Sequence, residues 1–197
     1  MATKRTWTVK KSSNAAVYQL KITLQASHPP IWRRALVSAD ITLHQLHDTI
    51  QLLMGWSNSH LHQFIAAGVV YGEDDPEFGL GDEAEFVSEH KVVLQQLLRQ
   101  EKDKLIYEYD FGDSWEHKVV LEKILPPDPP GSYPICLTGK RACPPEDVGG
   151  MWGYDSFLEA IGDPENPEHE DMLEWAGAFD PEEFDLQEIN KRLDRLR

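Results

Sequence analysis

Apolar and polar residues alternate along several short stretches of the chain, which is the pattern of β-strands that bury one face. The first stretch, residues 17–25, reads VYQLKITLQ, and the second, residues 31–37, reads IWRRALV. Only a short interruption containing HPP separates them, so we expect the two strands to pair as a hairpin. The same pattern predicts strands around a tight turn in residues 60–72, and two further strands in residues 103–111 and 115–125.

The segment ITLHQLHDTIQLLMGW predicts a helix. Thr42, followed three residues later by Gln45, matches a capping box at the start, and Gly55 suits the end. The apolar residues recur at the spacing of one helix face: Leu43, Leu46, Ile50 and Leu53. Polar residues with the same spacing occupy another face, which we expect to be solvated: His44, His47, Asp48 and Gln51.

The remaining segments predict more helices and one long loop. A short helix is predicted in residues 91–101, whereas residues 126–153 are dense in Pro and Gly and are expected to be irregular. Beyond this loop, the spacing of apolar residues and the capping residues predict three helices. They are residues 154–161 before Gly162, residues 166–177 with Asn166 as N-cap and Gly177 as stop, and residues 185–196 with Asp185 as N-cap.

This order of elements predicts an α+β fold, with a mixed, mainly antiparallel sheet packed on a central helix and a helical C-terminal portion. The arrangement resembles the β-grasp, in which a sheet cradles one helix. We expect a single domain over residues 1–197, because no free linker and no internal repeat interrupts the pattern. Its expected parts are a flexible N-terminus (1–14), a sheet-and-helix core (15–125), a Pro/Gly-rich loop (126–153) and an acidic helical portion (154–197).

The charge is uneven along the chain. The net charge is −15, and the residues from Pro144 onward hold 16 Asp/Glu but only 4 Lys/Arg. Such a surface repels a nucleic-acid backbone, so direct nucleic-acid binding is disfavoured, whereas a basic protein partner is compatible with it. The simpler interpretation of this acidity is solubility alone.

No apolar run reaches the length of a membrane span, and the basic N-terminus is not followed by the apolar stretch of a secretory signal. We therefore expect a cytoplasmic protein without a membrane partner. The two cysteines, Cys136 and Cys143, lack the tight spacing of a redox or zinc pair. Reduced thiols are the favoured interpretation, and a disulfide is the alternative.

Several motifs together are specific to one family: PPIWRR, SHLHQF, YEYDFGDSWEH, CLTGKRACPPEDVGG and WGYDSFLEAI. On these motifs the chain, from Val17 to about Leu193, resembles the plasmid ORF-three-like family, whose members are also labelled insertion-element passenger TnpR-like proteins. The resemblance implies an association with plasmids and mobile elements, but no catalytic residues. The TnpR label would imply a resolvase. We find no serine-recombinase catalytic segment near the N-terminus, and the acidic surface suits DNA poorly.

Histidines and carboxylates suggest a metal site. His60 and His62 form an H-x-H pair, and residues two apart on a strand point the same way. The segment YDFGDSWEH favours a hairpin turn at Gly112–Ser114, and one continuous strand is the alternative. Both geometries would bring an Asp near His117. The candidate ligands for zinc or another divalent transition metal are His60, His62, His117, Asp110, Asp113, Glu146 and Asp147. Structural hydrogen bonds at a sheet surface are the alternative, and the more common, use of such histidines.

A second candidate set consists of residues that could line a pocket: Trp115, Arg33, Trp152 and Tyr154. Arg33 and Arg34 are suited to binding an anion, although an internal salt bridge is the simpler assignment. Two hypotheses for the function result. The first is a binding or accessory module for a protein or small ligand, and the alternative is a metal-dependent hydrolase that uses the His/Asp/Glu cluster.

Overall fold

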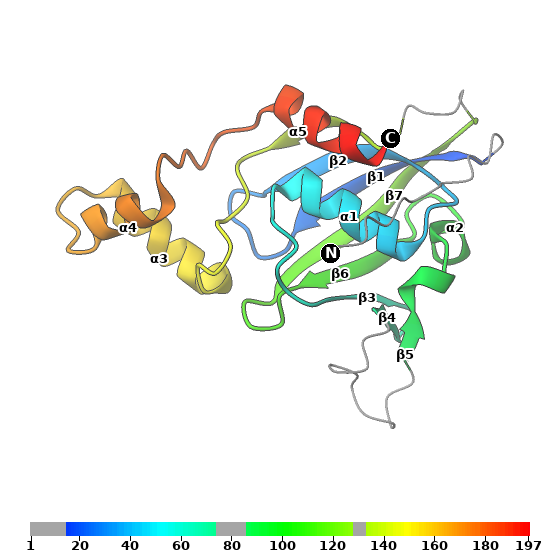
Figure 1. Cartoon of the computed structure of the whole chain (residues 1–197), viewed down its shortest axis with the longest axis horizontal. Coiled ribbons are helices and arrows are strands. Elements are labelled where there is room, and N and C mark those ends of the chain that lie inside the picture. Colours follow the sequence, from blue (N-terminus) through cyan, green and yellow to red (C-terminus); the bar gives the residue numbers. More distant parts are fainter. Residues whose placement is uncertain (1–14, 74–85, 128–132) are drawn as a thin grey trace, which may run out of the picture.

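A computed structural model describes residues 15–73, 86–127 and 133–197, so the predicted flexible N-terminus (1–14) lies outside the described residues. Eight strands form one mixed sheet in the order β5-β4-β3-β6-β7-β1-β2-β8 (Figure 1). Together with five helices they confirm the predicted α+β class. The strands are β1 (Val17–Leu24), β2 (Trp32–Ser38), β3 (His62–Ala66), β4 (Val69–Gly72), β5 (Phe86–Ser88), β6 (Lys104–Tyr109), β7 (Trp115–Leu125) and β8 (Ile135–Lys140).

The predicted hairpins are confirmed. β1 pairs with β2, β3 with β4 and β6 with β7, each in the antiparallel sense. The first and last of these hairpins are joined in the centre of the sheet, where β1 and β7 also run antiparallel. The turn between β6 and β7 spans residues 110–114, which is where the Gly-Asp-Ser sequence predicted it.

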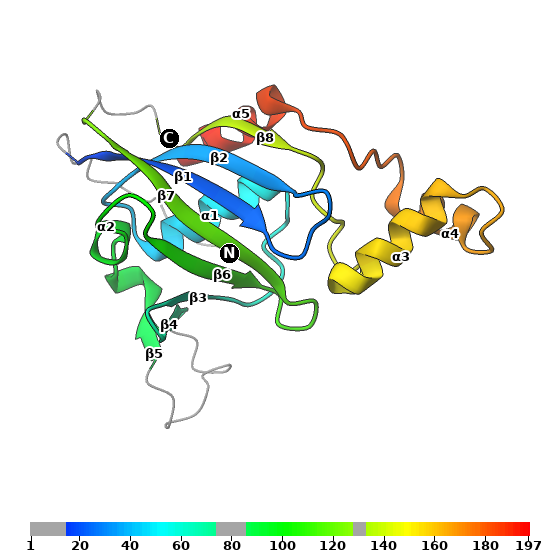
Figure 2. The ribbon, with the colours of Figure 1, turned by 180° about the vertical axis from the view of Figure 1, so that it is seen from behind.

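Helix α1 (Leu43–Met54) lies across one face of the sheet, and its start and end follow the sequence prediction (Figures 1 and 2). Thr42 and Gln45 form a reciprocal capping box, and Gly55 ends the helix in the left-handed conformation. The apolar face is fully buried in the core. The expected solvation of the polar face is wrong, because His47 and Gln51 are buried almost as completely as the leucines. Both side chains form hydrogen bonds with the hydroxyl group of Tyr107 on β6.

Two strands were missed by the sequence analysis. β8 lies inside the Pro/Gly-rich loop that was expected to be irregular, and it pairs with β2 at one edge of the sheet. Its short apolar alternation is flanked by prolines and glycines, which mask the signal of a strand. β5 has three residues and pairs in parallel with β4, too short a stretch for periodicity to reveal.

The other helices are α2 (Leu94–Leu97), α3 (Gly150–Gly162), α4 (His169–Ala176) and α5 (Leu186–Leu193). α5 begins at its predicted cap, Asp185, and packs beside α1 and β8. α4 begins at His169, not at the predicted Pro167, because Asn166 caps a preceding turn through the backbone N–H of Glu168. α3 and α4 pack against each other and project away from the sheet (Figures 1 and 2). None of the described helices is both long and apolar enough to cross a lipid bilayer.

Candidate functional site

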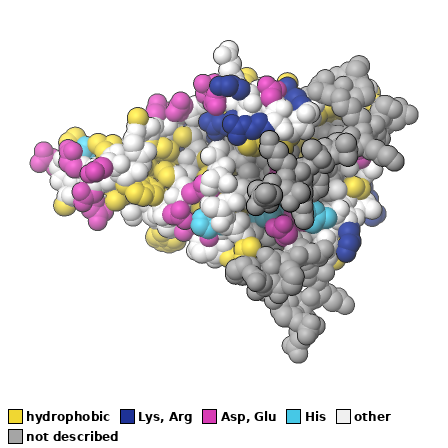
Figure 3. Space-filling model, in the orientation of Figure 1, with side chains coloured by type: hydrophobic (Ala, Val, Ile, Leu, Met, Phe, Trp, Pro, Cys, Tyr) yellow, Lys and Arg dark blue, Asp and Glu magenta, His cyan; other side chains and the backbone are white. Residues whose placement is uncertain are grey.

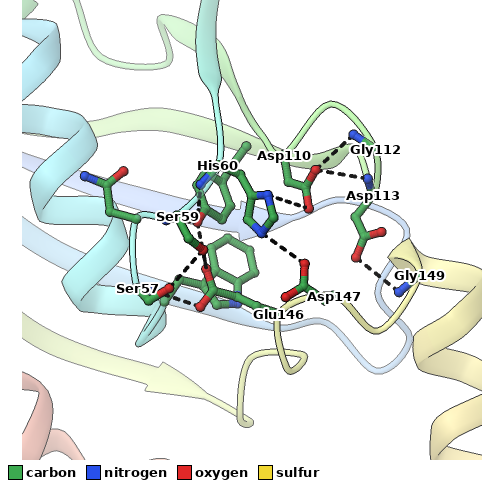
Figure 4. A network of polar contacts seen from close by, with 12 residues as sticks. Ser57, Ser59, His60, Asp110, Gly112, Asp113, Glu146, Asp147 and Gly149 are labelled. Atoms are coloured by element: carbon green, nitrogen blue, oxygen red, sulfur yellow. Dashed lines mark hydrogen bonds and ion pairs between the residues drawn. The ribbon is translucent and has the colours of Figure 1, made fainter.

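Three loops that are distant in sequence meet at one end of the sheet. The loop between α1 and β3 carries His60, the turn between β6 and β7 begins at Asp110, and the loop between β8 and α3 carries Asp147 (Figure 4). We refer to these three residues as the loop-borne site. They belong to the set of metal ligands predicted from the sequence, and each is an imidazole or a carboxylate.

The imidazole of His60 lies between the two carboxylates. Its Nδ1 is 3.6 Å from Oδ2 of Asp110, and its Nε2 is 3.0 Å from Oδ1 of Asp147. One potential ligand atom from each of the three residues lies within 4.8 Å of the other two. The Asp147 side chain is 70% exposed, whereas that of Asp110 is 12% exposed. The site is therefore anchored on one side and open to solvent on the other.

Asp110 has two tasks, one for each carboxylate oxygen. Oδ1 accepts hydrogen bonds from the backbone N–H groups of Gly112, at 2.9 Å, and Asp113, at 3.4 Å, and these bonds shape the turn. Oδ2 is the oxygen that faces His60. Asp110 itself has φ +58°, in the left-handed region that Asp tolerates better than most residues. Asp147 also has a left-handed backbone, at φ +61°.

Glu146, which we predicted as a metal ligand, instead ties the loops together. Its carboxylate accepts hydrogen bonds from the Tyr109 hydroxyl at 2.7 Å and from the backbone N–H of Ser57 at 3.0 Å. The Tyr109 oxygen in turn accepts from the backbone N–H groups of Ser59, at 3.0 Å, and His60, at 3.3 Å. Burial, followed by the hydrogen bond to Glu146, raises the pKa of Tyr109 to about 12, so its hydroxyl stays a donor. This chain fixes the backbone that presents His60.

Asp113, another predicted ligand, joins the β6–β7 turn to helix α3. Its Oδ2 accepts the backbone N–H of Gly149 at 3.1 Å. The next residue, Gly150, has φ +68°, and a Cβ there would lie 2.5 Å from the backbone oxygen of Asp113. Only glycine permits so close an approach in this conformation. Asp113 therefore positions the start of α3 beside the loop-borne site (Figure 4).

The three predicted histidines do not converge. Within residues 15–73, 86–127 and 133–197, no potential metal-ligating group contains two of His60, His62 and His117. The ring of His117 is completely buried, its Nδ1 donates to the Trp115 carbonyl at 3.0 Å, and Trp56 packs edge-on against it at 5.2 Å. Burial lowers the pKa of His117 to about 4, which keeps the ring neutral.

His62 belongs to a second group, the histidine layer, made of His44, His47, His62 and Glu89 between α1 and the sheet. Glu89 is fully buried, and its two oxygens lie 2.9 Å from His44 Nδ1 and 2.8 Å from His62 Nε2. The rings of His47 and His62 stack at 3.5 Å, nearly parallel. Burial acts to raise the pKa of Glu89, but the hydrogen bonds from His44 and His62 outweigh it and lower that pKa to about 2.

His47 takes part in a closed ring of hydrogen bonds with three polar side chains. Asn58 Oδ1 can only accept, so His47 donates from Nε2 at 2.8 Å, and its Nδ1 accepts from the Tyr107 hydroxyl at 2.8 Å. Gln51 donates to the Tyr107 oxygen at 2.9 Å and accepts from the Asn58 backbone N–H at 3.0 Å. Desolvation, followed by the nearby His62, lowers the pKa of His47 to about 3. Sequence reasoning missed this layer, because its members come from three separate segments: helix α1, strand β3 and the turn that begins at Glu89.

The predicted pocket residues occupy different environments. Trp115 is buried beside Trp56, and Trp152 is 87% exposed at the start of α3. Tyr154 is buried in the packing between α3 and Phe179. Arg33 is buried and donates to the backbone carbonyls of Leu53 and Lys140, at 3.1 and 2.9 Å, with no carboxylate partner among the described residues.

The internal salt bridge that we expected for one of the two arginines belongs to Arg34. Its guanidinium pairs with Glu122 through two hydrogen bonds, at 2.6 and 2.9 Å. Both cysteines are free, in line with the favoured interpretation.

Comparisons with known proteins agree with the motifs quoted above. The sequence profile of the plasmid pRiA4b ORF-3-like proteins matches residues 16–188. The uncharacterized protein y4hQ of Sinorhizobium fredii is 38% identical over 185 residues, which cover 92% of this chain and 93% of that protein. A crystal structure of a protein of unknown function from Methanosarcina mazei Go1 has 41% identity and a TM-score of 0.81, covering 91% of this chain and 98% of that one. The chain therefore belongs to the plasmid pRiA4b ORF-3-like family.

Proposed function

We propose that this protein is a binding module that holds a divalent transition-metal ion at the loop-borne site and binds a small ligand on the open side of that ion. The observation that carries this proposal is the convergence of His60, Asp110 and Asp147 from three loops, with their potential ligand atoms within 4.8 Å of one another. One imidazole and two carboxylates suit zinc, manganese or iron(II).

The surroundings of the site support this assignment. The Glu146–Tyr109 chain and the Asp110 turn restrain the backbones of two of the three ligands, which lowers the entropic cost of assembling a metal site. The described part of the chain places no Lys or Arg in an ion pair with Asp110 or Asp147. Two carboxylates that have no Lys or Arg partner in the described residues and flank an imidazole favour a cation between them.

The test is calorimetric titration of the full chain, purified without a histidine tag, with Mn²⁺ and Zn²⁺. We expect one ion per chain and a loss of affinity of about tenfold or more in His60→Ala and in Asp110→Asn. The matched control is His90→Ala, because His90 belongs to the other potential ligand group, with His44 and Glu89. Unchanged binding in His60→Ala, or a loss in His90→Ala alone, would contradict the proposal.

A metal-dependent hydrolase is a second candidate, favoured by the exposure of Asp147 at 70%. Three protein ligands leave coordination positions for water, as catalytic metal sites do and structural zinc sites do not. The same proteins can be assayed with bis(p-nitrophenyl) phosphate and p-nitrophenyl acetate in the presence of Mn²⁺ or Zn²⁺. Turnover that disappears in His60→Ala favours the hydrolase. Metal binding without turnover favours the binding module alone.

A further inference from the structure

A second surface lies apart from the loop-borne ligands. Residues 150–176, with α3 and α4, form an arm that extends from the sheet (Figures 1 and 2). Aromatic contacts join the two helices of the arm to each other and to the segment that follows, because the Phe157 ring lies edge-on to Trp175, at 5.9 Å, and to Phe179, at 5.2 Å. No residue of α4 is buried, so this helix presents most of its surface to solvent.

The arm is acidic and contains no Lys or Arg that would neutralise its carboxylates. No Lys or Arg occurs between Pro144 and Asn190. The arm carries eight acidic residues: Asp155, Glu159, Asp163, Glu165, Glu168, Glu170, Asp171 and Glu174. None of them forms an ion pair with a basic residue in the described part of the chain. In the face shown in Figure 3, Asp and Glu side chains cover the end of the arm, whereas Lys and Arg lie over the body of the molecule.

Large apolar side chains are exposed on the same arm. Trp152 is 87% exposed, Trp175 is 49% exposed and Leu173 is 37% exposed. Leu173 and Trp175 lie on the same short helix as Glu170, Asp171 and Glu174. Exposed tryptophans are costly in a surface that only has to be soluble, and Trp is the residue type most enriched among those that dominate binding energy.

We propose that the arm is a docking surface for a basic amphipathic segment of another protein, one that combines Lys or Arg with large apolar side chains. The uncompensated carboxylates supply attraction and orientation, and Leu173, Trp175 and Trp152 supply apolar area. Nucleic acids and anionic lipid surfaces carry the same sign of charge as the arm and are repelled by it. A second copy of the chain would bring one acidic arm towards another molecule of net charge −15.

The experiment measures fluorescence anisotropy of a labelled helical peptide of about 18 residues, built from Lys and Leu on opposite faces, with the full chain. The matched peptide has Glu in place of every Lys. We expect saturable binding of the Lys peptide only, weakening as NaCl rises from about 50 to 500 mM. The double variant Glu170→Lys/Glu174→Lys should weaken binding by about tenfold or more.

The control is Glu101→Lys/Glu116→Lys, which changes the net charge equally at exposed positions outside the arm. It should weaken binding by less than about threefold, because the effect of distant charges is screened. Trp175→Ser should weaken binding at high salt as well, because its contribution is apolar. Circular dichroism checks that each variant is folded.

Three outcomes would overturn the proposal. Equal weakening by both double variants would mean that the peptide responds only to net charge. Absence of saturable binding up to about 100 μM would mean that the arm has no such site. A dimer in sedimentation that Trp175→Ser dissociates would identify a second copy as the occupant. Peptide binding is expected to be retained in His60→Ala, because the loop-borne ligands lie outside the arm.

Discussion

The loop-borne site and the histidine layer use the same residue types in opposite ways. In the histidine layer, Glu89 has no exposed surface and each of its oxygens is within 2.9 Å of an imidazole nitrogen. At the loop-borne site, Asp147 is 70% exposed and shares one histidine with Asp110 at 3.0 and 3.6 Å. Fully paired buried groups stabilise a fold, whereas partly paired exposed groups remain available to a ligand. The difference lies in burial and pairing and cannot be recognised from residue identity.

The largest expected effect concerns the histidine layer. Replacing Glu89 by Ala removes the carboxylate that accepts hydrogen bonds from the buried His62 and the half-buried His44, so the free energy of unfolding should fall by about 3–5 kcal/mol. Urea denaturation measures it, with the exposed Glu116→Ala as a control that should change stability by less than about 0.5 kcal/mol. Similar losses for Glu89→Ala and Glu116→Ala would mean that the layer is not structural.

A smaller effect is the response of the layer to acid. The folded pKa of His47 is about 3, below its unfolded value, so its contribution to stability is fully present above the unfolded pKa and is lost progressively as the pH falls from that value through the folded pKa. His44 has a raised pKa, chiefly from its hydrogen bond to Glu89, and it contributes in the opposite direction.

Comparison with His47→Gln isolates the first of these contributions. Between pH 7 and pH 6, the wild-type protein should lose on the order of 0.7 kcal/mol more stability than the variant, since one pH unit per proton corresponds to about 1.4 kcal/mol. Chemical denaturation at the two pH values provides the measurement. Parallel pH profiles for the two proteins would show that His47 is not held neutral by the fold.

The smallest expected effect is at the loop-borne site. His60→Ala should change the free energy of unfolding by less than about 0.5 kcal/mol without metal, because its Asp147 partner is exposed and its contact with Asp110 is long, at 3.6 Å. In saturating Mn²⁺ the wild-type protein should become more stable, and the variant should not. Thermal denaturation with and without the ion reports both quantities. A large loss without metal would place His60 with the structural histidines and remove the contrast between the two groups.

Local signals in the sequence were sufficient for most of the fold. Thr42 and Gln45 marked the start of α1, and the Gly112–Ser114 turn placed two strands correctly. Three members of the predicted metal set do lie together, because that turn and the Pro/Gly-rich loop are adjacent in space.

The histidine layer was not predictable by the same means. Glu89 lies 45 residues from His44 and 27 from His62, and no periodicity connects them. The polar face of α1 was expected to be solvated, since amphipathic spacing cannot show that a polar row has partners on a sheet. His47 and Gln51 are buried because Tyr107 and Asn58 satisfy them, a fact that belongs to tertiary structure.

The close approach of Gly150 to Asp113 connects the start of α3 directly to the turn between β6 and β7. Asp147 lies only three residues before Gly150. The residue between this loop and Gly150, Gly149, donates its backbone N–H to the carboxylate of Asp113. A partner bound to the arm that tilted α3 would therefore displace the loop that carries Asp147, one of the two carboxylates facing His60. Occupancy of the arm and occupancy of the site would then be reciprocally linked, each altering the affinity of the other by the same factor.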